Sequence, residues 1–166
     1  SEEFYDNEVD FDNVNNLIDA PEHQEKIAEL RAAMRAEMVN TYDTGLMPES
    51  MRNRRRTLNK TTFYEMVRDP NLDPLEKYLD TADIALARKS ENMPTLVEYL
   101  KDEDECMRYW GVIGCLLLEE KAAAAKDELA KLMDDESIEI PIFAAWALYK
   151  MGEKKVGIDK LSSILH

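Results

Sequence analysis

An arginine run holds the residues of this sequence whose type and spacing best suit a binding chemistry. Arg52, Arg54, Arg55 and Arg56 form the only basic cluster in a chain whose formal net charge is -14. Guanidinium groups carry paired N–H donors whose geometry fits the oxygens of sulfate as well as those of phosphate. The run therefore predicts a possible anion-binding or sulfate-binding site. The alternative is structural: the arginines pair with the acidic segment 2–12 or with other nearby acids.

Two cysteines are the remaining candidates for a nucleophile. Cys106 and Cys115 lie on one predicted helix, where nine residues of rise separate them by ~13.5 Å, too far for a disulfide. Reactive thiols need exposed, electropositive surroundings, whereas free cysteines are among the most buried residue types. We therefore expect two buried free thiols. Together with His23 and His166 they match no zinc-ligand spacing.

Acidic clusters raise the question of calcium, because hard cations prefer several oxygen ligands. The cluster Asp102-Glu103-Asp104 has Met107 and Ile113 at the sixth and twelfth positions, where an EF-hand loop needs Gly and Glu. We interpret such clusters as solvated turns, in which Asp104 or Ser137 caps the following helix. The residues predict no catalytic, cofactor-binding or metal-binding site in this chain.

Composition limits the class of protein. The chain has 166 residues, 45% of them hydrophobic and 34% charged, which is typical of a folded soluble chain with one domain and a tail. Its 35 acidic residues outnumber 21 Lys plus Arg, so most of the surface repels phosphate backbones and anionic lipids. No run approaches the ~18 apolar residues of a membrane span. We expect neither nucleic acid nor a membrane span.

The first third of the chain divides into three segments by pattern. Residues 1–20 are strongly acidic and predict an extended arm that docks on something. A helix is expected over 21–42, because Ile27, Leu30, Met34 and Met38 recur at steps of three and four. Residues 43–62 interrupt this periodicity and contain Gly45, Pro48 and the arginine run, so we predict an ordered loop or linker there.

The remainder, 63–166, repeats itself at an offset of 33 residues. Apolar residues fall on apolar ones and Asp102-Glu103 falls on Asp135-Glu136, which is typical of stacked helix pairs. The pattern predicts helices over 93–101, 106–119, 126–134 and 140–151, a degenerate earlier unit over 63–88 and a final half-unit from 158. Trp110 and Trp146 are expected in the core, and small residues should admit close helix approach: Gly111, Gly114, Ala144 and Ala147. The predicted fold class is all-α, a short right-handed α-α superhelix preceded by the extended arm and helix.

Two resemblances accompany these patterns. The helix-pair period with paired acids in its turns resembles HEAT-like repeats over 63–166, and this resemblance implies a curved surface for partners. The runs Glu3-Phe4-Tyr5-Asp6, Val14-Asn15-Asn16-Leu17 and Pro21-Glu22-His23 resemble the C-terminal end of the formylglycine-dependent sulfatases. Asn7, Phe11 and Asn13 depart from that family's pattern, although its spacing is kept.

A further stretch extends the second resemblance. Residues Asp43-Thr44-Gly45-Leu46-Met47-Pro48-Glu49 and then Tyr64-Glu65-Met66 are similar to the extension of a bacterial sulfatase subgroup that carries helical repeats. The resemblance implies a noncatalytic C-terminal module of a bacterial sulfatase, a sulfuric ester hydrolase, whose parent chain needs calcium and formylglycine. It also implies an exported or periplasmic location.

The sulfatase nucleophile motif, Cys/Ser-x-Pro/Ala-x-Arg, is matched at neither Cys106 nor Cys115. The expected partners are therefore the parent's own catalytic domain, a sister subunit or a sulfated glycan. The alternative is a freestanding HEAT-like adaptor that takes part in protein-protein interaction.

Overall fold

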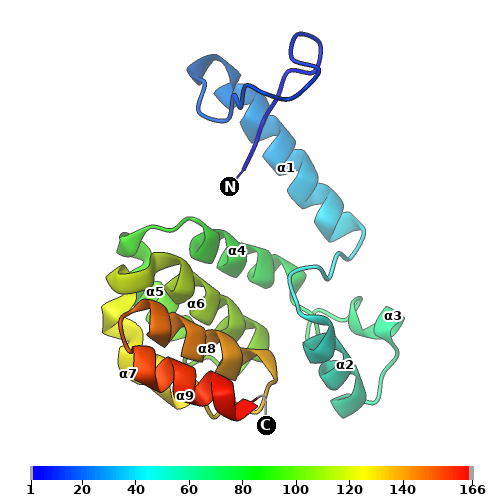
Figure 1. The fold of residues 1–166 in the computed structure, drawn as a ribbon. Helices are drawn as coiled ribbons and strands as arrows, with labels where there is room; N and C mark the ends of the chain where they lie inside the picture. Colours follow the sequence, from blue (N-terminus) through cyan, green and yellow to red (C-terminus); the bar gives the residue numbers. More distant parts are fainter. Residues whose placement is uncertain (1, 165–166) are drawn as a thin grey trace. The chain divides into compact units, whose positions relative to one another are not determined.

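The computed structural model describes residues 2–164, and these residues form helices joined by turns, with no strand among them (Figure 1). The all-α prediction is confirmed. The chain divides into two compact units, Ser1–Asp43 and Thr44–His166, here called the N-terminal unit and the helical unit.

The N-terminal unit contains a short 3-10 helix, Pro21–His23, and helix α1, Gln24–Asn40. The predicted helix therefore forms. Its apolar stripe is mostly exposed, because Ile27 is the only residue of α1 that is buried, while Leu30 and Met34 are exposed. This helix is amphipathic without a covered apolar face within the described chain.

The residues before α1 correct the prediction of an extended arm. The backbone N–H of Leu17 donates to the Phe4 carbonyl over 2.7 Å, and the N–H of Phe4 donates to the Asn16 side chain over 3.0 Å. Asp10 accepts from the backbone N–H groups of Val14 and Asn15. The segment is a turn-rich loop closed on itself, because short Asp and Asn side chains bond the nearby backbone and bend it.

The prediction of a loop or linker over 43–62 was wrong for its central part, where helix α2 spans Glu49–Leu58. Pro48 precedes the first turn, Glu49 lies in it, and Arg55 and Arg56 lie in the last turn. These charges suit the helix dipole at both ends. Helix α3 follows at Phe63–Met66 and is opened by a reciprocal capping box between Thr62 and Glu65.

The rest of the helical unit is built from two rows of helices (Figure 1). In one row, α4 (Leu75–Leu86) packs on α6 (Glu105–Leu118), which packs on α8 (Glu139–Lys150). In the other, α5 (Met93–Tyr99) packs on α6, while α7 (Lys126–Leu132) and α9 (Lys154–Ile164) pack on α8. Short 3-10 segments at Ser90–Asn92 and Glu119–Ala125 lead into α5 and α7. One core of buried apolar side chains runs between the rows.

Small residues permit this close packing. A Cβ placed on Gly114 would lie 3.3 Å from the Cα of Ala85, and one on Gly111 would lie 3.1 Å from the backbone N of Leu100. Gly152 has a φ of 94° and ends α8: its N–H donates to the Tyr149 carbonyl, and the next N–H reaches Leu148. This is the Schellman arrangement, which glycine favours because it has no Cβ.

One turn geometry recurs at the predicted spacing of 33 residues. In each case an aspartate side chain accepts a hydrogen bond from the backbone N–H two residues later. The three pairs are Asp69 with Asn71, Asp102 with Asp104, and Asp135 with Ser137. The described helices thus share a periodic local element, although a right-handed superhelix remains an interpretation.

Candidate functional site

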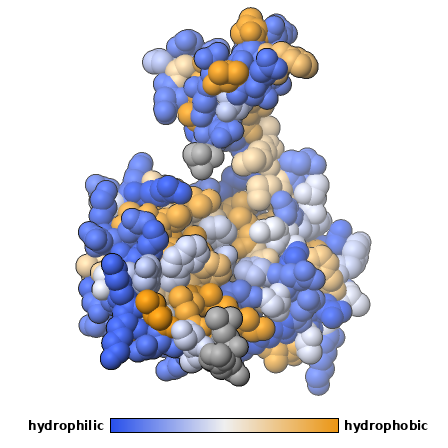
Figure 2. Space-filling view, viewed as in Figure 1, coloured by the Kyte–Doolittle hydropathy of each residue, from blue (hydrophilic) through white to orange (hydrophobic). Residues whose placement is uncertain are grey.

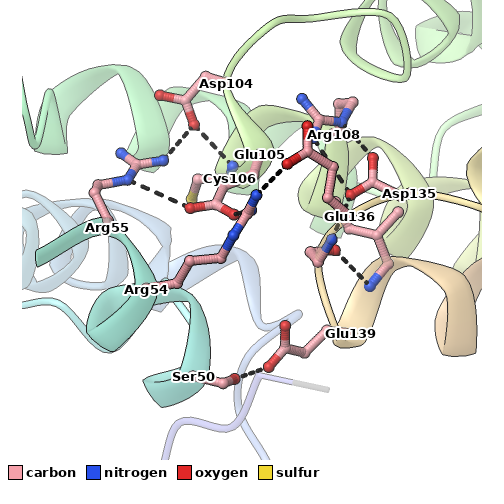
Figure 3. A network of polar contacts seen from close by, with 12 residues as sticks. Ser50, Arg54, Arg55, Asp104, Glu105, Cys106, Arg108, Asp135, Glu136 and Glu139 are labelled. Carbon is pink, nitrogen blue, oxygen red and sulfur yellow. Dashed lines mark hydrogen bonds and ion pairs between the residues drawn. The ribbon is translucent and has the colours of Figure 1, made fainter. Parts of the chain in front are cut away.

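Helix α2 places the arginine run against the turns that precede α6 and α8 (Figure 3). Met47 and Met51 are buried in the core of the helical unit and fix α2 in place. The indole N–H of Trp110 also donates to the Leu46 carbonyl over 2.9 Å, which ties the segment before α2 to α6. These apolar anchors orient Arg54 and Arg55 toward the acidic turns.

Arg54 joins two turns that are far apart in the sequence. One terminal nitrogen donates to Glu105 over 2.6 Å, and the other donates to Glu136 over 2.5 Å. Glu105 begins α6 and is buried, whereas Glu136 lies in the exposed turn before α8. A single guanidinium therefore bridges the starts of neighbouring helix pairs.

Arg55 lies deeper than Arg54 and has four partners. It donates to Asp104 over 2.8 Å, to the Leu72 carbonyl over 3.1 Å and to the Tyr78 hydroxyl, and it lies 3.6 Å from Glu105. Burial acts to lower the pKa of Arg55, but the bond to Asp104 and its charge outweigh burial and raise that pKa above its usual value. Arg55 is a permanently charged buried cation.

Asp104 is the main anion opposite Arg55. It caps α6 by accepting from the N–H of Cys106, and it also accepts from the Tyr78 hydroxyl over 2.6 Å. Burial acts to raise the pKa of Asp104, but the hydrogen bonds from Arg55 and Tyr78 outweigh burial and lower it. The predicted cap by Asp104 is present, and so is the one by Ser137, whose hydroxyl accepts from the N–H of Ile140.

A second buried acid faces the same cluster. Asp73 lies just before α4, and burial raises its pKa to about 6. The charge of Arg55 lowers the pKa of Asp73 in part, while the charge of Asp104 raises it further. Asp73 is thus the member of the cluster whose ionisation is least well compensated.

Two further contacts extend the network to α8. Arg108 on α6 donates to Asp135 over 2.8 Å and to the carbonyls of Asp102 and Glu103 in its own turn. Ser50 on α2 donates to Glu139 in the first turn of α8. Figure 3 shows these contacts in one strip along the starts of α6 and α8.

The other two arginines of the run lie outside this strip. Arg52 donates to the Thr44 hydroxyl over 2.7 Å and lies over the Phe63 ring at 5.8 Å, while Arg56 is exposed. The structure therefore divides the predicted site: Arg54 and Arg55 have carboxylate partners, as the structural alternative supposed, and these partners are turn acids of the helical unit. Anion binding by Arg52 and Arg56 stays a prediction.

The cysteines lie where the sequence predicted. Both are fully buried and free. Burial raises the pKa of the Cys106 thiol well above its usual value and that of Cys115 to about 12. Neither thiol forms a thiolate near neutral pH, which removes the nucleophile that cysteine chemistry needs. His23 packs against the Phe4 ring at 5.6 Å, and His166 lies outside the described residues.

Within residues 2–164, no three or more His, Cys, Asp or Glu side chains are grouped so that they could hold a metal ion. The carboxylates of the network contact guanidinium groups instead. No helix in this part of the chain combines the length and the apolar character needed to cross a bilayer.

Sequence reasoning missed the acids that meet the arginine run, because it treated the run as part of a loop. The signals that could have revealed α2 are Pro48-Glu49 at its start and the four-residue spacing of Met47 and Met51.

Comparisons with known proteins add no assignment. No protein-family model, curated protein or solved structure matches this chain.

Proposed function

We propose that this chain is a noncatalytic C-terminal module of a larger sulfatase, in which HEAT-like helix pairs serve as a scaffold or interaction surface. The residue matches at positions 3–23 and 43–76 motivate the parent enzyme. The module's partners are the parent's catalytic domain or a sister subunit.

The observation that carries the proposal is the uncovered apolar surface of the N-terminal unit. Val9, Phe11 and Val14 are exposed in its loop, with Phe11 89% exposed, and Leu30 and Met34 are exposed on α1. Several large apolar residues exposed together mark an interaction site in a folded protein. A unit that buries so little of its own apolar surface is expected to be part of a larger assembly.

The helical unit supports the repeat interpretation. Its helix pairs α5–α6 and α7–α8 begin 33 and 34 residues apart, at Met93 and Lys126 and at Glu105 and Glu139. The aspartate turns recur at the same spacing. Stacked pairs of this kind present extended surfaces and carry no chemistry of their own.

The chemistry of the proposed parent would reside outside this chain. Formylglycine is made from a Cys or Ser in a motif that neither buried cysteine matches. The described residues also do not fit a calcium site, because the turn acids are taken up by Arg54, Arg55 and Arg108. No catalytic step is assigned to any residue here.

Two measurements test the proposal. The reading frame upstream of Ser1 should encode a Cys/Ser-x-Pro/Ala-x-Arg motif in frame with this chain. The isolated chain should release no sulfate from an aryl sulfate, whereas the complete polypeptide should do so. Turnover by the isolated chain, or a stop codon directly upstream, refutes the proposal.

The second candidate is a freestanding HEAT-like adaptor that binds a protein partner. The loop that closes on itself at Phe4 and Leu17 favours it, because an adaptor needs an ordered N-terminus. An open reading frame that begins within a few residues of Ser1 would select this candidate over the enzyme module.

A sulfated glycan remains a proposed partner of the exposed arginines. Binding of a heparin-like polymer at low salt should weaken when Arg52 and Arg56 are both changed to Ala, and it should disappear at high salt. Arg68→Ala serves as a control on a neighbouring exposed cation. Equal binding by the double variant rejects the glycan.

A further inference from the structure

The row of helices α4, α6 and α8 leaves one lateral surface uncovered. Helix α6 packs against α4 on one side and α8 on the other, whereas α8 has α6, α7 and α9 as its principal neighbours in the described chain. The remaining side of α8 carries exposed apolar residues: Ile138 is 69% exposed and Trp146 is 43% exposed. Trp146 thus departs from its predicted place in the core. Apolar residues gather over α8 in the view of Figure 2.

Helix α9 continues this surface. Gly157 faces α8, since a Cβ there would lie 2.7 Å from the Ala145 carbonyl. The opposite side of α9 carries Lys155, Ile158, Asp159 and Ser162, which are all exposed and follow the steps of one helix face. Ile158 is 51% exposed. We call this the end surface: Ile138 and Trp146 of α8 with Lys155, Ile158 and Asp159 of α9.

Charge distinguishes the end surface from the rest of the molecule. Residues 150–164 contain four lysines and two acids, a local net charge of +2, whereas the whole chain carries -14. Lys150 and Lys160 pair with Glu119 and Asp134, respectively. Two copies of an acidic chain repel each other at most surfaces, and this repulsion is least where lysines gather beside exposed apolar residues.

The exposed stripe of α9 is also self-complementary. If two copies of α9 pack antiparallel about a two-fold axis near Gly157, Lys155 of one copy lies opposite Asp159 of the partner subunit, and the reverse pair forms as well. Ile158 then lies near the axis. A surface that pairs with itself in this way suits a closed two-fold dimer, which is the commonest oligomer of soluble proteins.

We propose that two copies of this chain associate through the end surface, with α9 packed antiparallel on α9 of the partner subunit. The inference deepens the proposed function by naming the sister subunit as the module's partner, and it rests on the helical unit being an interaction surface. The dimer covers Ile158 and the neighbouring apolar residues of α8, and the charge pairs set its register.

Sedimentation velocity of the chain from low to high micromolar concentration tests the dimer. Ile158→Asp should leave only monomer, because it buries an unpaired charge next to its copy in the partner. Lys155→Asp and Asp159→Lys should each weaken association about tenfold, because each places like charges opposite one another. The double exchange K155D/D159K restores both opposite-charge pairs and should recover most of the affinity.

Three controls keep the outcome clear. Phe11→Asp, an equally drastic change on the N-terminal unit, should leave the dimer unchanged, and the melting temperature of every variant should stay near that of the parent chain. A chain that stays monomeric at all concentrations overturns the inference. So does a dimer that survives Ile158→Asp, dissociates with Phe11→Asp, or fails to recover in the double exchange. A monomeric chain whose gene encodes the sulfatase motif upstream would reject the dimer while leaving the proposed function intact.

Discussion

The two units of this chain differ in how they are held together. The helical unit has one continuous core that includes Leu96, Leu129 and Ile140, each almost completely buried. The N-terminal unit instead depends on backbone turns and on an exposed ion pair between Glu2 and Arg31. Helices are present in both units, so helix formation alone does not make a stable fold. Burial of the apolar stripe does, because it supplies most of the stability that offsets chain entropy.

The largest expected effect follows from separating the units. Residues 44–166 alone should unfold cooperatively within a few degrees of the melting temperature of the full chain. Residues 1–43 alone should lose most of their helical circular dichroism, because a single uncovered helix of this length is marginal in water. Cooperative thermal unfolding of the short fragment would show that the N-terminal unit has stabilising contacts of its own.

Arginine substitutions sharpen the comparison. Arg55→Ala should lower the free energy of unfolding by about 3–5 kcal/mol, because Asp104 is left as a buried unpaired charge. Arg31→Ala should cost at most about 1 kcal/mol, because the Arg31–Glu2 pair is exposed to solvent and screened by it. The side chain of Arg55 is 10% exposed and that of Arg31 is 48% exposed. Urea unfolding of the two variants side by side measures the difference, and equal losses would contradict it.

Asp73 predicts a pH effect confined to the helical unit. Its folded pKa of about 6 lies above the ordinary aspartate value of 3.8, so the folded state binds the extra proton between these values. Stability from this group is therefore present at low pH and is lost as the pH rises through about 6. Asp73→Asn should add about 2 kcal/mol at neutral pH and flatten the pH dependence above about pH 4.

The control and the opposing groups for this measurement are also clear. Asp12→Asn, on the exposed loop of the N-terminal unit, should leave the profile unchanged. Asp104 and Asp135 act with the opposite sign: their lowered pKa values make stability fall as the pH drops below the ordinary aspartate range. A profile that Asp73→Asn leaves unaltered would reject the uncompensated burial of that carboxylate.

The smallest effect is expected on α1. Leu30→Gln and Met34→Gln should each change the free energy of unfolding by no more than about 0.5 kcal/mol, because both side chains are exposed. Chemical denaturation followed by tryptophan fluorescence reports the helical unit, which contains Trp110 and Trp146, and circular dichroism reports α1. A loss above about 1.5 kcal/mol would place these side chains in a packed interface.

Sequence patterns located the long helices well because their apolar residues face a core on one side. The predicted ranges 93–101, 106–119, 126–134 and 140–151 correspond to α5, α6, α7 and α8 within two residues at each end. Helix α2 was missed because only Met47 and Met51 anchor it, and two apolar residues give too short a period to recognise. The loop before α1 was misjudged because its turns depend on side-chain bonds from Asp10 and Asn16, which composition does not reveal.

The sequence by itself determined that this chain is acidic, helical and periodic, and that its cysteines are buried, because these properties follow from composition and from spacing along one chain. Only the tertiary structure decided which acids meet which arginines. Arg54 contacts Glu136 across 82 positions of sequence, and no local pattern encodes that distance. Such contacts form when packed helices bring remote turns together, so the pairing is a property of the core beneath them.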